Sequence, residues 1–176
     1  MIRKIVSADN PILRKKCKNI PKIDKKIINL ARDLKETLKS QKDPEGVGLA
    51  APQVGKNLRM FAMVHENNIL IVINPKVISI AKPSKKQPKK KKQILEGCLS
   101  LPDFYGPLQR PQKITIKYQD TQGKKVKNTF TGFSAQIVQH EIDHLNGILF
   151  VDNLIKQKKP LYELIDEEWH EVDLPY

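Results

Sequence analysis

The pentapeptide HEIDH, His140–His144, constrains this chain more than any other feature. It lies in a segment that Ser134 can cap as a helix and that ends near Asn146 and Gly147, where a left-handed helix C-cap fits. On a helix, residues i and i+4 lie about 40° apart around the axis and about 6 Å apart along it, so both imidazoles can reach one metal ion. Glu141 lies beside them and can take a proton from a water on that ion.

A catalytic metal site of this kind has three protein ligands and one open position, so one ligand remains to be found. No third ligand follows at the spacing used by the common zinc proteases, and Asp152 is the nearest acid downstream. Cys98 is the stronger candidate, although without the histidine pair a small buried thiol would be its simpler interpretation. Gly97 beside it permits a close backbone approach. Asp143 is expected to orient a ligand or cap a local hydrogen bond rather than to bind the ion.

A second unusual segment, Gly46–Gly55 (GVGLAAPQVG), has three glycines among small apolar residues. Its backbone is expected to turn sharply or to lie close to another group. It lacks both the G-x-G-x-x-G spacing after a strand and the lysine of a P-loop, which argues against phosphate binding. Gln53 offers an uncharged amide donor that suits a developing oxyanion, and its alternative role is to tie down its own loop.

Outside these motifs, the apolar pattern predicts several elements. Asp24–Gln41 is expected to be an amphipathic helix, with its first residue as the N-cap. Leu58–Val64 and Ile69–Ile80 are expected to pair as strands, with an edge or bulge at Asn74–Pro75 because proline cannot donate to a ladder. Ile114–Phe130 alternates around a polar turn and is expected to be a hairpin.

The length of 176 residues favours one catalytic domain, 1–176, of the α+β class. We expect antiparallel or mixed β-sheets packed around a central helix that carries HEIDH, with an N-terminal amphipathic helix and a short C-terminal helix. The tail, about residues 155–176, is expected to contain that last helix, which is acidic and starts at Pro160.

The charge is unevenly distributed. The chain has 32 Lys and Arg against 19 Asp and Glu, a net charge of +13, and seven of the lysines fall within Lys82–Lys92. Residues 82–93 are expected to form an exposed lysine-rich loop. Two cysteines are too few for a disulfide scaffold, and Cys17 is expected to be a small buried thiol. No signal peptide or membrane span is evident, so a cytoplasmic protein is expected.

Three segments, taken in order, resemble the three signature motifs of the peptide deformylases: GVGLAAPQVG, EGCLSLP and QHEIDHLNG. The likeness extends from the start of the chain to about Leu154. The resemblance implies that Cys98, His140 and His144 bind the metal and that Glu141 acts as general base and then as general acid. It also implies that the side chain of Gln53 and the backbone N–H of Leu99 hold the oxyanion, and that Gly48 pairs with the substrate backbone.

The implied reaction is hydrolysis of the N-formyl group from the initiator methionine of new polypeptides, which releases formate. The resemblance implies one divalent metal ion, usually Fe²⁺, for which Zn²⁺ or Ni²⁺ can substitute. Apolar residues near the motifs are expected to form the pocket for the methionine side chain. These residues are Val47, Leu95, Phe133 and Ile137, with Gly97 beside them.

Three features differ from the commoner pattern of this family. Tyr105 stands where many relatives have an arginine that helps to bind the substrate backbone. The acidic tail replaces the basic C-terminal helix with which some relatives dock on the ribosome. The inserted run Lys85–Lys92 is either a solvated loop or a substitute for that helix, which would contact ribosomal RNA near the exit tunnel.

Two other classes of protein share part of the pattern. An ordinary zinc metallopeptidase would share HEIDH but would have a third ligand downstream and would cleave internal peptide bonds. A nucleic-acid-binding protein with a structural Cys/His metal would explain the charge, but it would have a fourth ligand, and here aromatic residues are only 6% and are not interleaved with the lysines. We expect formylmethionyl nascent peptides as partners, and neither DNA nor membrane.

Overall fold

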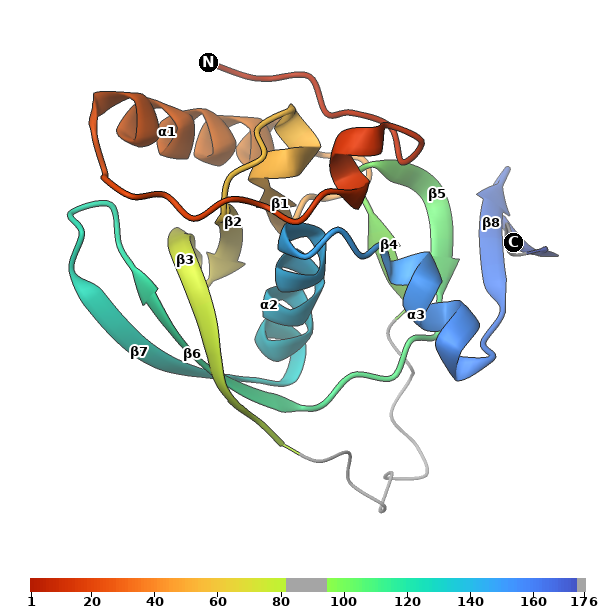
Figure 1. Cartoon of the computed structure of the whole chain (residues 1–176). Helices are drawn as coiled ribbons and strands as arrows, with labels where there is room; N and C mark the ends of the chain where they lie inside the picture. The colour runs from red at the N-terminus through yellow and green to blue at the C-terminus, as the bar shows by residue number, and fades with distance from the viewer. Residues whose placement is uncertain (82–94, 174–176) are drawn as a thin grey trace.

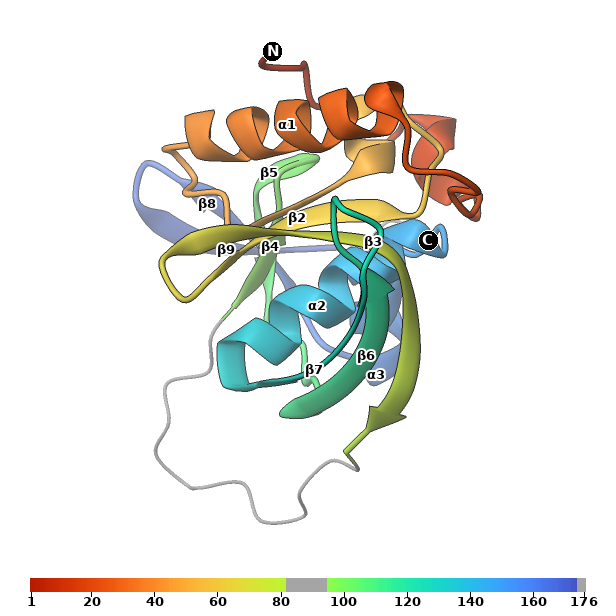
Figure 2. The same cartoon turned by 90° about the vertical axis from the view of Figure 1, so that its left-hand side faces the viewer.

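The computed structural model describes residues 1–81 and 95–173, which form three α-helices and nine strands in two sheets (Figures 1 and 2). The larger sheet has the order β1 (Gly48–Ala50), β2 (Met60–His65), β3 (Asn68–Ile80), β6 (Lys113–Gln119) and β7 (Lys125–Thr131). The smaller sheet has the order β4 (Glu96–Cys98), β5 (Leu101–Gly106), β8 (Leu161–Ile165) and β9 (Glu168–Val172). All neighbouring strands are antiparallel, which confirms the predicted α+β class. The predicted loop 82–93 lies outside the described residues.

Helix α1 (Lys25–Ser40) confirms the predicted N-terminal amphipathic helix. Asp24 caps it, because its side chain accepts a hydrogen bond from the backbone N–H of Ile27 at 3.0 Å. Leu30, Leu34 and Leu38 recur at helical spacing on one face and are buried in a cluster that also contains residues of β1 and β2. Helix α1 therefore covers one side of the larger sheet, as Figure 2 shows.

The predicted strand pair forms the β2–β3 hairpin, and the predicted interruption is a shift of the β3–β6 register between Ile73 and Lys76. Asn74 adopts a left-handed conformation there, with φ of 51°. Its side chain accepts from the N–H of Ile20 and donates to the carbonyl of Ile20, both at 2.8 Å. The irregular backbone is thus tied to the segment before α1.

Helix α2 (Gly132–Leu145) is the central helix (Figure 1). It packs against β1, β2, β6 and β7, and HEIDH lies in its last two turns. The helix begins earlier than predicted, because Thr131 rather than Ser134 is its N-cap. Its end agrees with the prediction, since Gly147 follows in a left-handed conformation with φ of 76°. A Cβ atom there would lie 2.5 Å from the carbonyl oxygen of Arg14, so this position requires glycine.

The predicted acidic helix from Pro160 is wrong. Residues 161–172 form the β8–β9 hairpin, and the short helix near the C-terminus is instead α3 (Phe150–Gln157). Asp166 and Glu167 both have positive φ, 48° and 65°, as a two-residue hairpin turn requires. Strand β8 pairs with β5, so the edge of the smaller sheet supplies the backbone hydrogen bonds that a helix would have made internally.

No helix among residues 1–81 and 95–173 has the length and apolar character needed to cross a membrane.

Candidate metal centre

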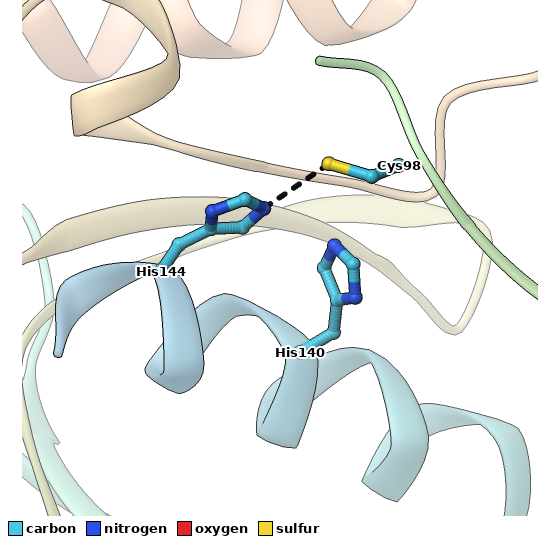
Figure 3. A group of neighbouring side chains, drawn as sticks. All are labelled: Cys98, His140 and His144. Atoms are coloured by element: carbon cyan, nitrogen blue, oxygen red, sulfur yellow. Dashed lines mark hydrogen bonds between the residues drawn. The ribbon is translucent and has the colours of Figure 1, made fainter. Parts of the chain in front are cut away.

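The structure brings the three predicted ligands together (Figure 3). Cys98 ends β4, while His140 and His144 lie one turn apart on the same face of α2. One ligand atom from each of the three side chains lies within 4.8 Å of the other two. Sγ of Cys98 is 3.3 Å from Nε2 of His144.

This arrangement fits a divalent metal ion. Bonds of about 2.3 Å to sulfur and about 2.0 Å to nitrogen at a tetrahedral angle separate the two ligand atoms by about 3.5 Å. The observed separation of 3.3 Å between Cys98 and His144 is close to that value. A thiolate with two imidazoles is also a donor set that Zn²⁺, Fe²⁺ and Ni²⁺ accept. That the three residues bind a metal remains a prediction.

The charges of the three side chains are coupled. Although burial opposes ionisation, the imidazoles of His144 and His140 hold the pKa of Cys98 well below its usual range. Burial also opposes the charged form of His140, but hydrogen bonds to Cys98 and Glu96 raise the pKa of His140 well above its usual range. The neighbouring imidazoles therefore favour the thiolate of Cys98, which is the form in which cysteine binds metals.

A buried polar network orients His140. Nδ1 of His140 donates to Oε1 of Glu96 at 2.7 Å, which leaves Nε2 for a metal. Arg110 donates to both oxygens of Glu96, at 2.6 and 2.7 Å, and to Asp143 at 2.9 Å. Burial opposes the charge on Glu96, but hydrogen bonds from Arg110 and His140 hold the pKa of Glu96 at about 2. Asp143 thus supports a ligand through Arg110 and Glu96, in line with its expected role.

Sequence reasoning missed Glu96 and Arg110 as parts of the site. Glu96 lies two residues before Cys98, so its place in the EGCLSLP motif was a usable signal. Arg110 follows β5 in a connecting segment, and no local pattern distinguishes it from the other basic residues.

Glu141 is buried, with an exposed fraction of 2%. Its Oε2 has no hydrogen-bond partner in the part of the chain that the structure describes. Burial raises the pKa of Glu141 to about 7, although the neighbouring His140 and His144 oppose this shift. A carboxylate that titrates near neutral pH is suited to both taking and returning a proton.

The structure shows one of the two roles considered for Gln53, and the other, as an oxyanion donor, stays a prediction. Its Oε1 accepts from the backbone N–H of Ala50 at 2.8 Å, which ties down its own loop. Its Nε2 donates to Ser100 Oγ at 3.2 Å and toward Cys98 Sγ at 3.5 Å, so the amide points at the candidate metal centre.

A cavity of about 200 Å³ opens beside these residues. It is several times larger than the volume of about 30 Å³ that one water occupies in the liquid. All predicted catalytic and substrate residues line it, namely Val47, Gly48, Gln53, Leu95, Gly97, Leu99, Phe133, Ile137 and Glu141. Pro44, Glu45 and Tyr105 also line it and were not predicted as site residues.

Two alternatives are resolved by the geometry. Asp152 lies outside the ligand cluster, since it pairs with Arg14 at 2.5 Å and accepts from the N–H of Leu149 at 2.8 Å. Cys17 lies in the apolar core, and burial raises the pKa of Cys17 to about 11. The interpretation of Cys17 as a structural thiol is confirmed.

Comparison with known proteins identifies the family. The sequence profile of the family described as polypeptide deformylase matches residues 2–160. A peptide deformylase of Dictyoglomus thermophilum is 41% identical over 157 residues, which cover 89% of this chain and 95% of that protein. A peptide deformylase of Pseudothermotoga lettingae is 39% identical over 152 residues, which cover 86% of this chain and 82% of that protein.

Solved structures agree with the sequence comparison. The crystal structure of peptide deformylase from Thermus thermophilus has a TM-score of 0.78 and 36% identity, and covers 89% of this chain and 88% of that one. The crystal structure of peptide deformylase from Thermotoga maritima has a TM-score of 0.77 and 36% identity, and covers 87% of this chain and 97% of that one. The ordinary zinc metallopeptidase and the nucleic-acid-binding protein are thereby set aside. This chain belongs to the polypeptide deformylase family, whose members are enzymes that remove the N-formyl group from newly made polypeptides.

Proposed function

We propose that Glu141 is the general base and acid of this reaction, at a divalent metal held by Cys98, His140 and His144. The observation that carries the proposal is the buried carboxylate of Glu141, which lines the cavity with one oxygen unpartnered among the described residues. Leaving such a group without a partner costs about 1–3 kcal/mol, and a substrate or water in the cavity would supply the partner.

The metal proposed for the cell is Fe²⁺, with Zn²⁺ or Ni²⁺ as substitutes. A divalent ion in such a site polarises a carbonyl oxygen and lowers the pKa of a coordinated water from about 15.7 toward about 7. Glu96 supports this role, because its hydrogen bond to Nδ1 of His140 leaves Nε2 as the ring nitrogen that would bind the ion.

The chain's own residues then handle the proton and the negative charge. Glu141 takes the proton of the attacking water and returns it to the amine that leaves. Nε2 of Gln53 and the backbone N–H of Leu99 donate to the oxyanion that develops on the formyl oxygen. The position of Gln53 Nε2, 3.5 Å from Cys98 Sγ, supports this role.

The peptide is proposed to bind along β1. Among the described strands, β1 is an edge strand that pairs only with β2, so its other edge can take an extended peptide by β-strand addition. Gly48 lies at the start of this edge, beside Glu141. The methionine side chain would occupy the apolar part of the cavity, formed by Val47, Leu95, Phe133 and Ile137, with Gly97 at its wall.

The proposed location is the cytoplasm, where new polypeptides are made and where a thiolate ligand stays reduced. Contact with the ribosome through Lys85–Lys92 is also proposed, on the basis of charge alone. Its test is deletion of Lys85–Lys92, which should weaken co-sedimentation with ribosomes at low salt. Unchanged co-sedimentation of the deletion variant would refute ribosome contact through Lys85–Lys92.

Formate release tests the proposed function. Protein purified anaerobically with Fe²⁺, or loaded with Ni²⁺, is expected to release formate from a formyl-Met-Ala-Ser peptide. The same protein should leave the internal bonds of an unformylated Met-Ala-Ser peptide intact. Internal cleavage without formate release would instead support a metallopeptidase.

A further inference from the structure

The smaller sheet has a charge opposite to that of the chain as a whole. Of the 32 Lys and Arg in the sequence, none falls in β4, β5, β8 or β9. The same strands contain five carboxylates: Glu96, Asp103, Glu163, Glu168 and Glu171. Glu96 is engaged with Arg110 and His140, which leaves four for other roles.

The strand register shows which of these residues share a face. Gly97 pairs with Tyr105, Tyr105 with Tyr162, and Tyr162 with Glu171. Residues directly opposite one another, and residues two apart along a strand, point to the same side of a sheet. Tyr105, Tyr162, Trp169 and Glu171 therefore share one face, which we call the aromatic face.

The other side of the sheet is closed. Phe104, Leu161 and Val172 belong to an apolar cluster with Phe150 and Leu154 of α3. Glu163 is on this closed side, because it pairs with Phe104. Figure 1 shows α3 beside β8 on this side. The aromatic face is thus the one left to meet a ligand.

The aromatic face continues the wall of the active-site cavity. Gly97 and Tyr105 line the cavity, and a Cβ atom on residue 97 would lie 2.7 Å from the Tyr105 ring. The Tyr105 ring meets Trp169 edge to face, with 5.4 Å between centroids and an interplanar angle of 87°. Trp169 is 50% exposed, so the aromatic wall extends from the cavity to solvent. The β8–β9 hairpin that provides Trp169 lies beyond the residues matched to the family, 2–160.

Carboxylates also lie in the wall of this cavity and next to its lining residues in the sequence. Glu45 lines it. Burial raises the pKa of Tyr105, and the charges of Asp103 and Asp43 raise it further. Asp43 is next to Pro44 in the sequence and Asp103 is next to Pro102, and both prolines line the cavity. Lys42 forms a backbone bridge with Glu45, but Lys42 is not among the residues that line the cavity.

We propose that the aromatic face is a subsite for a Lys or Arg side chain that follows formylmethionine in the substrate. This inference rests on the proposed function, in which the unpartnered carboxylate of Glu141 marks the reacting end of the same cavity. The aliphatic stem of the substrate residue lies against Tyr105 and Trp169, and its cation lies near Asp103 and Glu171. Cation–π contact and snorkelling of a long basic side chain are the interactions that such a surface supports.

Two peptide series test the subsite, formyl-Met-X-Ala-Ser and formyl-Met-Ala-X-Ser, with X as lysine, norleucine or glutamate. In at least one series, kcat/KM is expected to be roughly two- to fivefold higher for lysine than for the uncharged norleucine, and lowest for glutamate. The difference should appear in KM and should shrink as salt is added. Equal values for all three residues in both series would overturn the inference.

The variants separate this subsite from a general charge effect. Glu171→Gln removes a charge from the aromatic face and should reduce the preference for lysine. Glu163→Gln removes the same charge from the closed side and should leave the preference for lysine unchanged. Trp169→Ala should reduce the preference, and Trp169→Phe should retain most of it. Equal effects of Glu171→Gln and Glu163→Gln would contradict the subsite. Formate release without lysine preference refutes the subsite alone, while no formate release from any peptide refutes the proposed function as well.

Discussion

The carboxylate of Glu141 occupies the space where a side chain on Gly48 would begin: a Cβ atom there would lie 2.2 Å from Oε1 of Glu141. Gly48→Ala must therefore displace Glu141, and a misplacement of about 1 Å at a reacting group costs on the order of 100-fold in rate. We expect Gly48→Ala to lower kcat by about that factor. Its metal content, measured by elemental analysis, should stay unchanged.

Gly123→Ala is the matched control for this prediction. Gly123 has a positive φ of 81° and lies far along the chain in the β6–β7 turn. Its replacement should lower thermal stability and leave kcat intact. Full activity of Gly48→Ala would show that Glu141 does not need its observed position.

Gln53→Glu distinguishes the two roles of Gln53. The substitution keeps an acceptor for the N–H of Ala50 but removes the amide donor that points toward Cys98. Loss of one oxyanion donor costs about 3 kcal/mol, so kcat for formate release should fall about 100-fold or more. Ser100→Ala removes only a partner of that amide and should have a much smaller effect. A Gln53→Glu variant with near-normal kcat would leave Gln53 with only its loop-anchoring role.

Glu96→Gln tests the network behind His140. It replaces the charged partner of His140 Nδ1 and leaves the buried guanidinium of Arg110 with a weaker acceptor. Loss of such a supporting partner lowers metal affinity by about 10- to 100-fold, which competition with a chelator would measure for Zn²⁺ or Ni²⁺. Asp152→Asn, outside the ligand cluster, should bind metal as the unmodified protein does. If Asp152→Asn lowered the metal affinity and Glu96→Gln did not, Asp152 rather than the Glu96 network would support metal binding.

The sequence predicted the histidine pair from a short-range pattern, and it predicted Cys98, Gln53 and Gly48 from the resemblance of three motifs to one family. The spacing of His140 and His144 requires only a helix, and the amphipathic pattern of residues 24–41 requires only a buried face. Glu96 meets His140 across 44 residues of sequence and Arg110 meets Asp143 across 33, and no local period marks such contacts.

The C-terminal hairpin shows why the local sequence pattern predicted a helix from Pro160 that the structure does not contain. Residues 160–172 have an acidic, mixed composition compatible with a helix. Asp166 suits the first position of a two-residue hairpin turn, but Glu167 stands at the second position, where glycine is usual. The unpaired edge of β5 and the apolar contacts of Leu161 and Val172 decide the outcome instead. These are tertiary interactions, which override weak local preferences.

Asp33 is expected to make stability depend on acid pH. Burial opposes its charge, but hydrogen bonds from the terminal ammonium of Met1 and from Arg3 lower the pKa of Asp33. Because the folded-state pKa lies below the unfolded value of about 3.9, the stabilisation is present above about pH 4 and is lost as the pH falls through the folded value. Asp33→Asn should destabilise the protein by about 1 kcal/mol or less at pH 7, because the terminal ammonium that pairs with Asp33 is exposed to solvent.

Urea unfolding at pH 7, 5, 4 and 3 would measure this dependence, and the difference between Asp33→Asn and the unmodified protein should narrow at the lowest pH. Asp9→Asn, at an exposed position, is the matched control and should change little. A difference that stays constant with pH would refute the role of the Asp33 charge.

The decisive comparison is formate release by the unmodified protein and by Glu141→Gln, both loaded with Ni²⁺ and both assayed for bound metal. We expect one metal ion per chain in each, with formate released by the unmodified protein and turnover reduced by at least about 100-fold in the variant. Formate release by Glu141→Gln at the normal rate, with metal bound, would contradict the assignment of Glu141 as the proton acceptor.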